Sequence, residues 1–177
     1  MKIAAVIGHT SKSKGAYSKF FKMREFDFYT EVVKNLNDVE VFIYDEKISG
    51  YVTRVKANAK KLNTDDFDLI IELHFNHFKD TSANGCETLY YFKSKNAKYY
   101  AALFSETLND YTGIKLRNGG LKSLANKNDR GFAAVYYPKA PVILIEPFFG
   151  SNTSDCEKIQ SPENLACIIN EFTLQIQ

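Results

Sequence analysis

The sequence predicts an α/β fold in three layers, in which a mostly parallel, twisted sheet is flanked by helices on both faces. Three observations support this prediction. Several apolar runs are short and continuous, as is typical of strands buried on both sides. They alternate with segments of about 10 to 15 residues that have helical apolar spacing, which indicates β-α-β units. Three of the runs end at a histidine or a glutamate, and that end of the strands is where α/β sheets bind ligands.

Length and composition indicate one domain spanning residues 1–177. A chain of 177 residues with 45% hydrophobic and 25% charged residues can bury about two-thirds of its unfolded surface around one core. No apolar run approaches the roughly 20 residues needed to cross a bilayer, so we expect no integral membrane segment. The N-terminus lacks the pattern of a signal peptide. We therefore expect an intracellular product, or one exported by other means.

The charge pattern argues against nucleic acid as a partner, because a net charge of +2 is too small to indicate such binding. A local excess of positive charge nevertheless follows His9. It is explained either as a solvated loop face or as a surface that attracts an anionic polymer. The residues concerned are Lys12, Lys14, Lys19, Lys22 and Arg24.

Apolar periodicity predicts the elements of the first half of the chain. A buried strand over residues 3–7 ends at Gly8, and the polar, turn-forming residues 10–18 predict a loop above the end of that strand. The elements expected next are a helix over 24–37, a strand over 39–44, a basic helix over 51–62 and a strand over 66–73.

The second half gives a less regular pattern. We expect a strand over 85–92, a helix over 97–108, a strand over 142–145 and a last helix that begins at Ser161 with proline at its first position. Between them, Asn118-Gly119-Gly120 predicts a turn, residues 121–129 are polar, and residues 131–137 fit either a short helix or a strand.

Two of the three histidines stand just after buried strands. His9 follows the strand at 3–7, and His74 follows the strand at 66–73. One histidine in such a position commonly has a structural role, but two at one sheet edge fit a metal site. Catalytic zinc takes three protein ligands and leaves a position for water, and two histidines with one glutamate are a common set.

Spacing alone does not choose the third ligand. The candidates are Glu25, Glu72, Glu87 and Glu146. Glu25 is also explained as a first-turn carboxylate that interacts with the helix dipole. Glu72 shares a strand face with His74, so it either orients the imidazole or is neutralised by a lysine. His77, three residues after His74, is an alternative ligand or a substrate contact.

Several short blocks occur in a fixed order from residue 3 to about residue 156. They are Gly8-His9, Gly15-Ala16 with Glu25, Glu72-Leu73-His74-Phe75-Asn76, Gly85-Cys86-Glu87-Thr88, Leu144-Ile145-Glu146, Phe149 and Ser151-Asn152. Together these blocks resemble those of the zinc-dependent N-acetylmuramoyl-L-alanine amidases of the amidase-3 type. Members of that family hydrolyse peptidoglycan, so the resemblance implies peptidoglycan as the partner.

The resemblance implies roles for four residues. His9, Glu25 and His74 would bind one zinc ion per chain, which assigns the third ligand that spacing left open. Glu146 would be the catalytic acid/base, moving a proton from water to the leaving amine. The bond broken would be the amide between the lactyl group of N-acetylmuramic acid and the L-alanine of the stem peptide.

Three further residues are candidate substrate contacts, namely Asn76, His77 and Arg130. A solvated surface position is the alternative explanation for Arg130. The chain also departs from the family pattern in the loop over residues 10–15, where Thr10-Ser11-Lys12-Ser13-Lys14-Gly15 stands in place of the usual glycines and Asp-Pro-Gly-like turn, and at three single positions. Glu72 stands in place of the usual serine, His77 in place of a small residue, and Phe148 in place of the usual glycine.

The leading interpretation is a stand-alone lytic amidase of the phage or prophage endolysin type, expected to be a monomer. It would be synthesised in the bacterial cytoplasm without a recognisable signal peptide and would act on the cell wall after release or export. A bacterial autolysin domain separated from its export signal is an alternative with the same chemistry. A zinc exopeptidase would be favoured by an arginine clamp for a terminal carboxylate. A non-catalytic wall-binding domain would be favoured if no metal were bound.

Overall fold

A six-stranded sheet forms the centre of the computed structural model, which describes residues 1–177. The strands lie in the order β4-β1-β5-β8-β6-β7. Their bounds are β1 Ile3–Ile7, β4 Val39–Ile43, β5 Leu69–Leu73, β6 Cys86–Tyr91, β7 Leu116–Leu124 and β8 Val142–Glu146. All neighbouring strands run parallel except β6 and β8, which are antiparallel. The prediction of a mostly parallel sheet is therefore confirmed.

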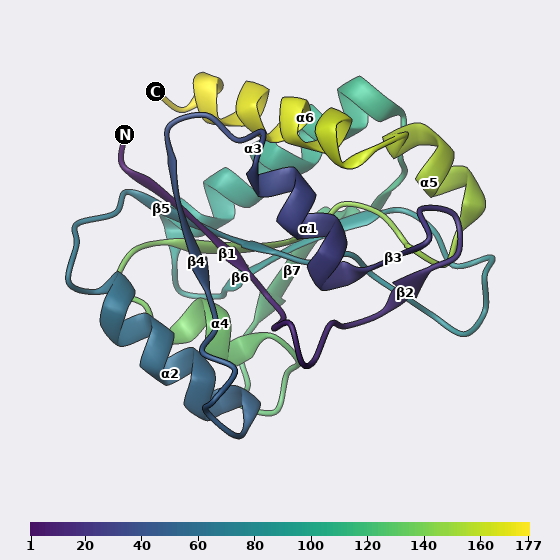
Figure 1. Cartoon of the computed structure of the whole chain (residues 1–177). Helices are drawn as coiled ribbons and strands as arrows, with labels where there is room; N and C mark the ends of the chain where they lie inside the picture. Colours follow the sequence, from purple (N-terminus) through teal and green to yellow (C-terminus); the bar gives the residue numbers. More distant parts are fainter.

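Helices cover both faces of this sheet (Figure 1). One face carries α1 (Glu25–Val33), α3 (Lys95–Thr112), α5 (Thr153–Ile159) and α6 (Pro162–Gln175), and the other carries α2 (Tyr51–Leu62) and α4 (Phe132–Tyr136). Alternate residues of β1 join separate apolar clusters on the two faces, with Ala5 on the first and Ala4 on the second. Burial on both faces explains why the strands are continuously apolar, and it confirms the three-layer prediction.

The predicted start of the last helix is confirmed. The Ser161 side chain accepts a hydrogen bond from the backbone N–H of Asn164, and Pro162 is the first residue of α6. Proline fits there because the first turn of a helix does not use its N–H groups. None of the helices has both the length and the apolar composition needed to cross a membrane.

The prediction of a turn at Asn118-Gly119-Gly120 was wrong, because these residues lie inside β7. All three have positive φ angles, of 48°, 72° and 77°, and the pairing of β7 with β6 shifts its register beside them. The tripeptide is therefore a bulge in the strand. Gly120 is needed there because a Cβ atom would lie 2.6 Å from the Cβ of Ser105.

Other boundaries also differ from the predictions. Helix α1 ends at Val33, α3 is longer than expected at both ends, and α5 was not predicted. Of the two alternatives for residues 131–137, the short helix α4 is the one that forms. The expected loop over residues 10–18 leads into a small hairpin of β2 (Tyr17–Ser18) and β3 (Met23–Arg24), which turns the chain directly into α1.

Candidate metal and catalytic site

His9 and His74 lie side by side at the carboxyl ends of β1 and β5. The two strands pair in parallel, with Ile7 opposite Leu73, and the two imidazole centroids are 5.1 Å apart. The His74 ring packs onto Gly8, where a Cβ atom would lie 2.0 Å from His74 Nε2. Only glycine leaves room for the ring at that position.

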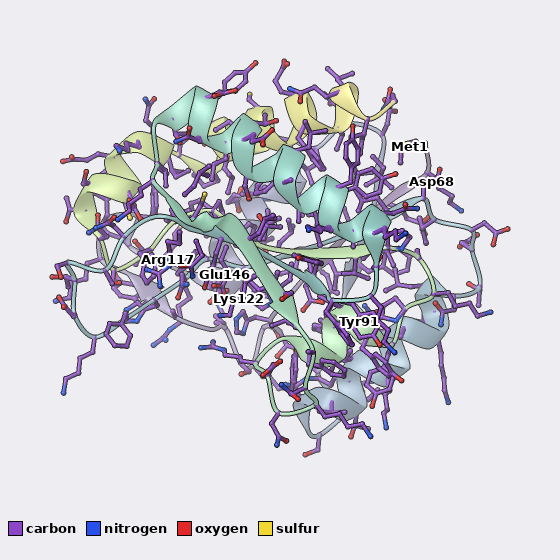
Figure 2. The ribbon with its side chains drawn as sticks, turned by 180° about the vertical axis from the view of Figure 1, so that it is seen from behind. Met1, Asp68, Tyr91, Arg117, Lys122 and Glu146 are labelled. Carbon is purple, nitrogen blue, oxygen red and sulfur yellow. The ribbon has the colours of Figure 1, made fainter.

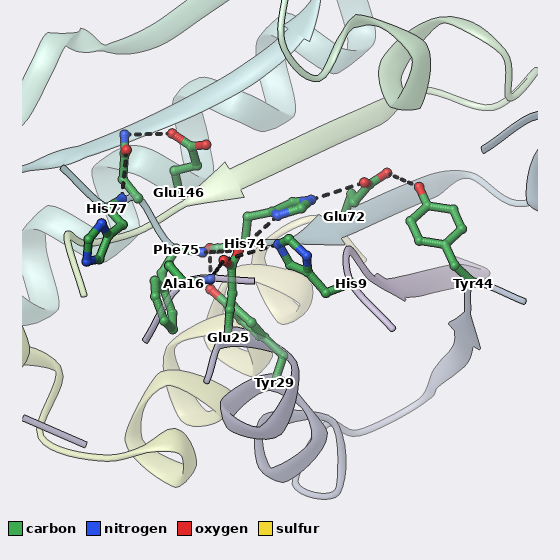
Figure 3. A network of polar contacts seen from close by, with 11 residues as sticks. His9, Ala16, Glu25, Tyr29, Tyr44, Glu72, His74, Phe75, His77 and Glu146 are labelled. Carbon is green, nitrogen blue, oxygen red and sulfur yellow. Dashed lines mark hydrogen bonds and ion pairs between the residues drawn. The ribbon is translucent and has the colours of Figure 1, made fainter. Parts of the chain in front are cut away.

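Glu25 reaches the two histidines from the first residue of α1 (Figure 3). Its Oε2 lies 3.1 Å from His9 Nε2, and its Oε1 lies 2.9 Å from His74 Nδ1. The backbone N–H groups of Ala16 and Phe75 donate hydrogen bonds to the same carboxylate, at 3.3 and 3.1 Å. Because the β2–β3 hairpin ends at Arg24, α1 starts at this point and presents Glu25 to the sheet edge.

His9, Glu25 and His74 fit a metal ion. One ligand atom from each lies within 4.8 Å of the others. His9 Nε2 is buried and lies 3.1 Å from Glu25 Oε2, yet it makes no hydrogen bond. A buried nitrogen without a hydrogen-bond partner suits a metal ligand. A Cβ atom on Gly15 would lie 2.6 Å from Glu25 Oε2 and 2.7 Å from His9 Nε2, so glycine keeps this space open. Two imidazoles and a carboxylate suit zinc.

The electrostatics of this group favour a positive charge between its members. Burial by itself would raise the pKa of Glu25, but the contacts with His74 and His9 lower it to about 2. Burial would lower the pKa of His74, but hydrogen bonds to Glu25 and Glu72 raise it to about 10. The carboxylates thus stabilise a proton at this position when no metal is bound, and they would stabilise a cation for the same reason.

Glu146 lies at the end of β8, opposite Glu87 of the antiparallel strand β6. The Asn76 amide donates to both carboxylates, at 2.7 Å to Glu146 Oε2 and 3.2 Å to Glu87 Oε1. Burial raises the pKa of Glu146; the charge of His74 opposes this, and Glu87 reinforces it, which gives a value of about 7. A carboxyl group with such a pKa can both take up and release a proton at neutral pH.

Glu87 was predicted only as an alternative metal ligand, but it lies outside the group of candidate ligands formed by His9, Glu25 and His74. Its oxygens face two cations of β7, Lys122 Nζ at 3.4 Å and Arg117 Nε at 3.8 Å. Figure 2 shows both of these side chains at the end of the sheet where Glu146 lies. The sequence block Gly85-Cys86-Glu87-Thr88 could have indicated that Glu87 belongs to the site. Its position opposite Glu146, however, depends on the antiparallel pairing of β6 with β8.

Two other sequence alternatives are resolved by the structure. The neutralisation of Glu72 by a lysine was wrong, since this carboxylate instead contacts His74 Nε2 at 3.1 Å and the Tyr44 hydroxyl at 3.0 Å. His77 lies outside the metal-ligand group. Its exposed side chain lines a separate surface groove, together with Phe78.

A cavity of about 210 Å³ opens onto the site. Its lining includes His9, Glu25, His74 and Glu146, together with Tyr51, Arg54 and Arg130. Neither Arg54 nor Arg130 forms an ion pair. The Nε of Arg54 is buried without a hydrogen-bond partner. The cavity therefore joins the candidate site to two cations that have no acidic partner.

Known proteins resemble this chain in sequence and in fold. The profile of the family Amidase_3, described as N-acetylmuramoyl-L-alanine amidase, matches residues 3–177. The chain belongs to this family. The resemblance found in the sequence blocks is thus confirmed, and hydrolysis of peptidoglycan amides is the activity by which the family is named.

The chain matches individual amidases over different fractions of their length. LytC of Bacillus subtilis (strain 168) is 26% identical over 157 residues, which cover 86% of this chain but 30% of LytC. The chain therefore spans about a third of that relative. The catalytic domain of the CD27L endolysin targeting Clostridia difficile is 26% identical, with a TM-score of 0.79 and coverage of 99% of this chain and 97% of that one.

A further solved structure supports the fold. The N-acetylmuramoyl-L-alanine amidase from Clostridium difficile 630 is 24% identical, with a TM-score of 0.76. The match covers 98% of this chain and 95% of that one. The fold is therefore shared with solved amidases along almost the entire chain.

Proposed function

We propose that the chain hydrolyses the amide bond between the lactyl group of N-acetylmuramic acid and the L-alanine of the peptidoglycan stem peptide. One zinc ion, held by His9, Glu25 and His74, would serve the reaction. The observation that carries this proposal is the grouping of these three ligands at the same sheet edge as Glu146, whose pKa is raised to about 7. Family membership supports the choice of substrate.

The residues divide the chemistry between them. Zinc in such a site supplies Lewis acidity and makes water nucleophilic at neutral pH. Glu146 accepts the proton of the attacking water and passes it to the nitrogen of the leaving L-alanine. Asn76 holds one oxygen of Glu146 by its hydrogen bond, which leaves the other oxygen for the proton. Glu87 contributes by keeping the pKa of Glu146 raised.

We assign substrate contacts to three residues around this centre. Arg130 lines the cavity and would bind a carboxylate of the stem peptide, with Arg54 beside it in the same lining. Asn76 lies between the two carboxylates, where it can also meet the substrate. His77 lies in the separate groove, and we assign it to a part of the substrate farther from the bond that breaks.

The biological role we favour is that of a stand-alone, monomeric endolysin. It would reach the bacterial wall after release or export. Similarity to nearly the full length of an endolysin catalytic domain supports it. The alternative is a catalytic domain of a longer bacterial amidase. The match to 30% of LytC supports that alternative.

One observation favours a second candidate activity, that of a zinc exopeptidase. Arg54 and Arg130 have no acidic partner and line the cavity that contains the site, so they offer a clamp for the terminal carboxylate of a peptide. Such an enzyme would release free amino acids from soluble peptides and would not require a glycan.

Digestion of purified peptidoglycan, with and without a chelator, tests the proposal. We expect new L-alanine amino termini and stem peptides detached from intact glycan, and we expect the chelator to abolish both. New reducing sugar ends or cleaved cross-bridges would contradict the amidase assignment. Release of single amino acids from soluble peptides would instead support the exopeptidase.

A further inference from the structure

A second buried carboxylate stands behind His74. Glu72 lies two residues earlier on β5 and therefore on the same face. Only 2% of its surface is exposed. One of its oxygens is 3.1 Å from His74 Nε2, and the other accepts a hydrogen bond from the Tyr44 hydroxyl at 3.0 Å. Figure 3 shows the resulting row of contacts from Tyr44 through Glu72 and His74 to Glu25.

We propose that Glu72 and Tyr44 are positioning residues, which fix the ring orientation and the tautomer of His74 for metal binding. The inference rests on the proposed function in one respect, because it takes His74 as a metal ligand. It gives Glu72, which is not one of the three proposed ligands, the role of orienting one of them. In the family pattern that the sequence resembles, this position is usually a serine, and a shorter, uncharged serine would not provide the same contact.

The tautomer follows from the donors and acceptors present. A neutral imidazole has one N–H group and one nitrogen lone pair, and an ionised carboxylate only accepts hydrogen bonds. Without a metal, both ring nitrogens of His74 can donate, Nδ1 to Glu25 and Nε2 to Glu72. A metal ion held by Nδ1 would replace the hydrogen there, and the remaining N–H group, at Nε2, would donate to Glu72. Metal-binding histidines commonly donate their other N–H to a carboxylate in this way, which orients the ring and makes the ligand more basic.

Tyr44 completes the arrangement. No lysine or arginine forms an ion pair with Glu72, and a buried charge without partners is strongly unfavourable. The Tyr44 hydroxyl, itself 4% exposed, occupies the oxygen that His74 does not use. The carboxylate is thereby held between two donors, and it cannot turn away from the ring without losing one of them.

Zinc affinity, measured in competition with a chromogenic chelator, tests the proposal without any substrate. We expect zinc to bind about 10- to 100-fold more weakly to Glu72→Ser. Glu72→Gln and Tyr44→Phe, which preserve size, should weaken binding by a smaller factor of about 3 to 10. Ser105→Ala is the matched control. This change removes a buried hydroxyl of α3 that bonds to Thr88 of β6 and to the carbonyl oxygen of Gly120 in β7. The zinc affinity of this variant should equal that of the unaltered protein.

The tautomer is tested separately by ¹H–¹⁵N NMR of the zinc-loaded protein. We expect a hydrogen-bonded Nε2–H signal from His74 that shifts in Glu72→Gln, a change that a general loss of stability would not produce. A His74 ring protonated at Nδ1, or zinc affinity within about threefold of the unaltered protein in both Glu72→Gln and Tyr44→Phe, would overturn the proposal. Both size-preserving variants remain decisive if Glu72→Ser does not fold. Neither measurement uses peptidoglycan. A failure of the proposed amidase activity can therefore be distinguished from a failure of the roles proposed for Glu72 and Tyr44.

Discussion

Glu25 and Glu146 are the same residue type at the same end of the sheet, yet their surroundings drive their pKa values apart. Glu25 lies against two histidines, which lower its pKa to about 2. Glu146 lies across from Glu87, and burial together with this second carboxylate raises its pKa to about 7. Environments that separate the pKa values of two carboxylates in this way support the different roles proposed for them. The first suits a permanently ionised ligand, and the second suits a group that exchanges protons.

Loss of the ligand carboxylate should have the largest effect. We expect Glu25→Gln to lose its zinc and to reduce kcat/KM by at least about 10⁴-fold, because water activation and oxyanion stabilisation disappear together. Metal analysis after gel filtration, combined with a peptidoglycan assay, measures both effects. Retention of one zinc per chain in this variant would show that Glu25 is not a ligand.

Loss of the proton carrier should separate chemistry from metal binding. We expect Glu146→Gln to reduce kcat by about 10²- to 10⁴-fold, while zinc content stays at one per chain. Glu106→Gln, which changes an exposed glutamate on α3, serves as the control and should match the unaltered protein. If the metal were lost with Glu146, this residue would be a ligand, and the contrast with Glu25 would fail.

Gly15→Ala should affect the metal side with a smaller magnitude. The added Cβ would lie 2.6 Å from Glu25 Oε2, at a backbone φ of +75°. Gly119→Ala is the matched control, since Gly119 has a φ of +72° with nothing within 4 Å of the added atom. Both variants should lose about 1–2 kcal/mol of stability from backbone strain, but only Gly15→Ala should bind zinc more weakly. Equal zinc affinities in the two would remove Gly15 from the site.

The contrast between the two carboxylates also predicts a pH dependence of stability in the presence of chelator. The folded-state pKa of Glu146 is raised from 4.5 to about 7, so its stabilising contribution is complete below pH 4.5 and is lost as the pH rises to about 7. We expect the free energy of unfolding of the unaltered protein, relative to Glu146→Gln, to fall over this range by at most about 3 kcal/mol. Denaturant titrations at several pH values measure the difference. If the free energies of unfolding of the two proteins changed in parallel with pH, the raised pKa of Glu146 would be contradicted.

The strands and the two histidines at their ends were predictable from the sequence. Strands β1, β5 and β8 are buried on both faces, so they must be continuously apolar, and the first polar side chains after them come to the sheet edge. His9 and His74 follow from this rule without further information. The last helix was equally readable, because its serine cap and first-turn proline act locally.

The remaining assignments needed contacts between distant parts of the chain. Glu25 becomes a neighbour of His9 because the β2–β3 hairpin turns the chain into α1 at that point, and its role was assigned beforehand only through the family resemblance. The Asn118-Gly119-Gly120 sequence looks like a turn by itself, but pairing with β6 makes it a bulge. Local preference was overruled there by the hydrogen bonds of the sheet.

The sequence by itself thus determined the order of the layers and which strand ends carry polar side chains, because burial on both faces leaves a direct pattern along the chain. The tertiary structure alone decided which carboxylate faces which partner. Glu87 meets Glu146 through an antiparallel pairing, and Glu72 meets Tyr44 from another strand end. A pKa or an imidazole tautomer depends on distances of a few ångströms between such residues, and no periodicity in the sequence encodes those distances.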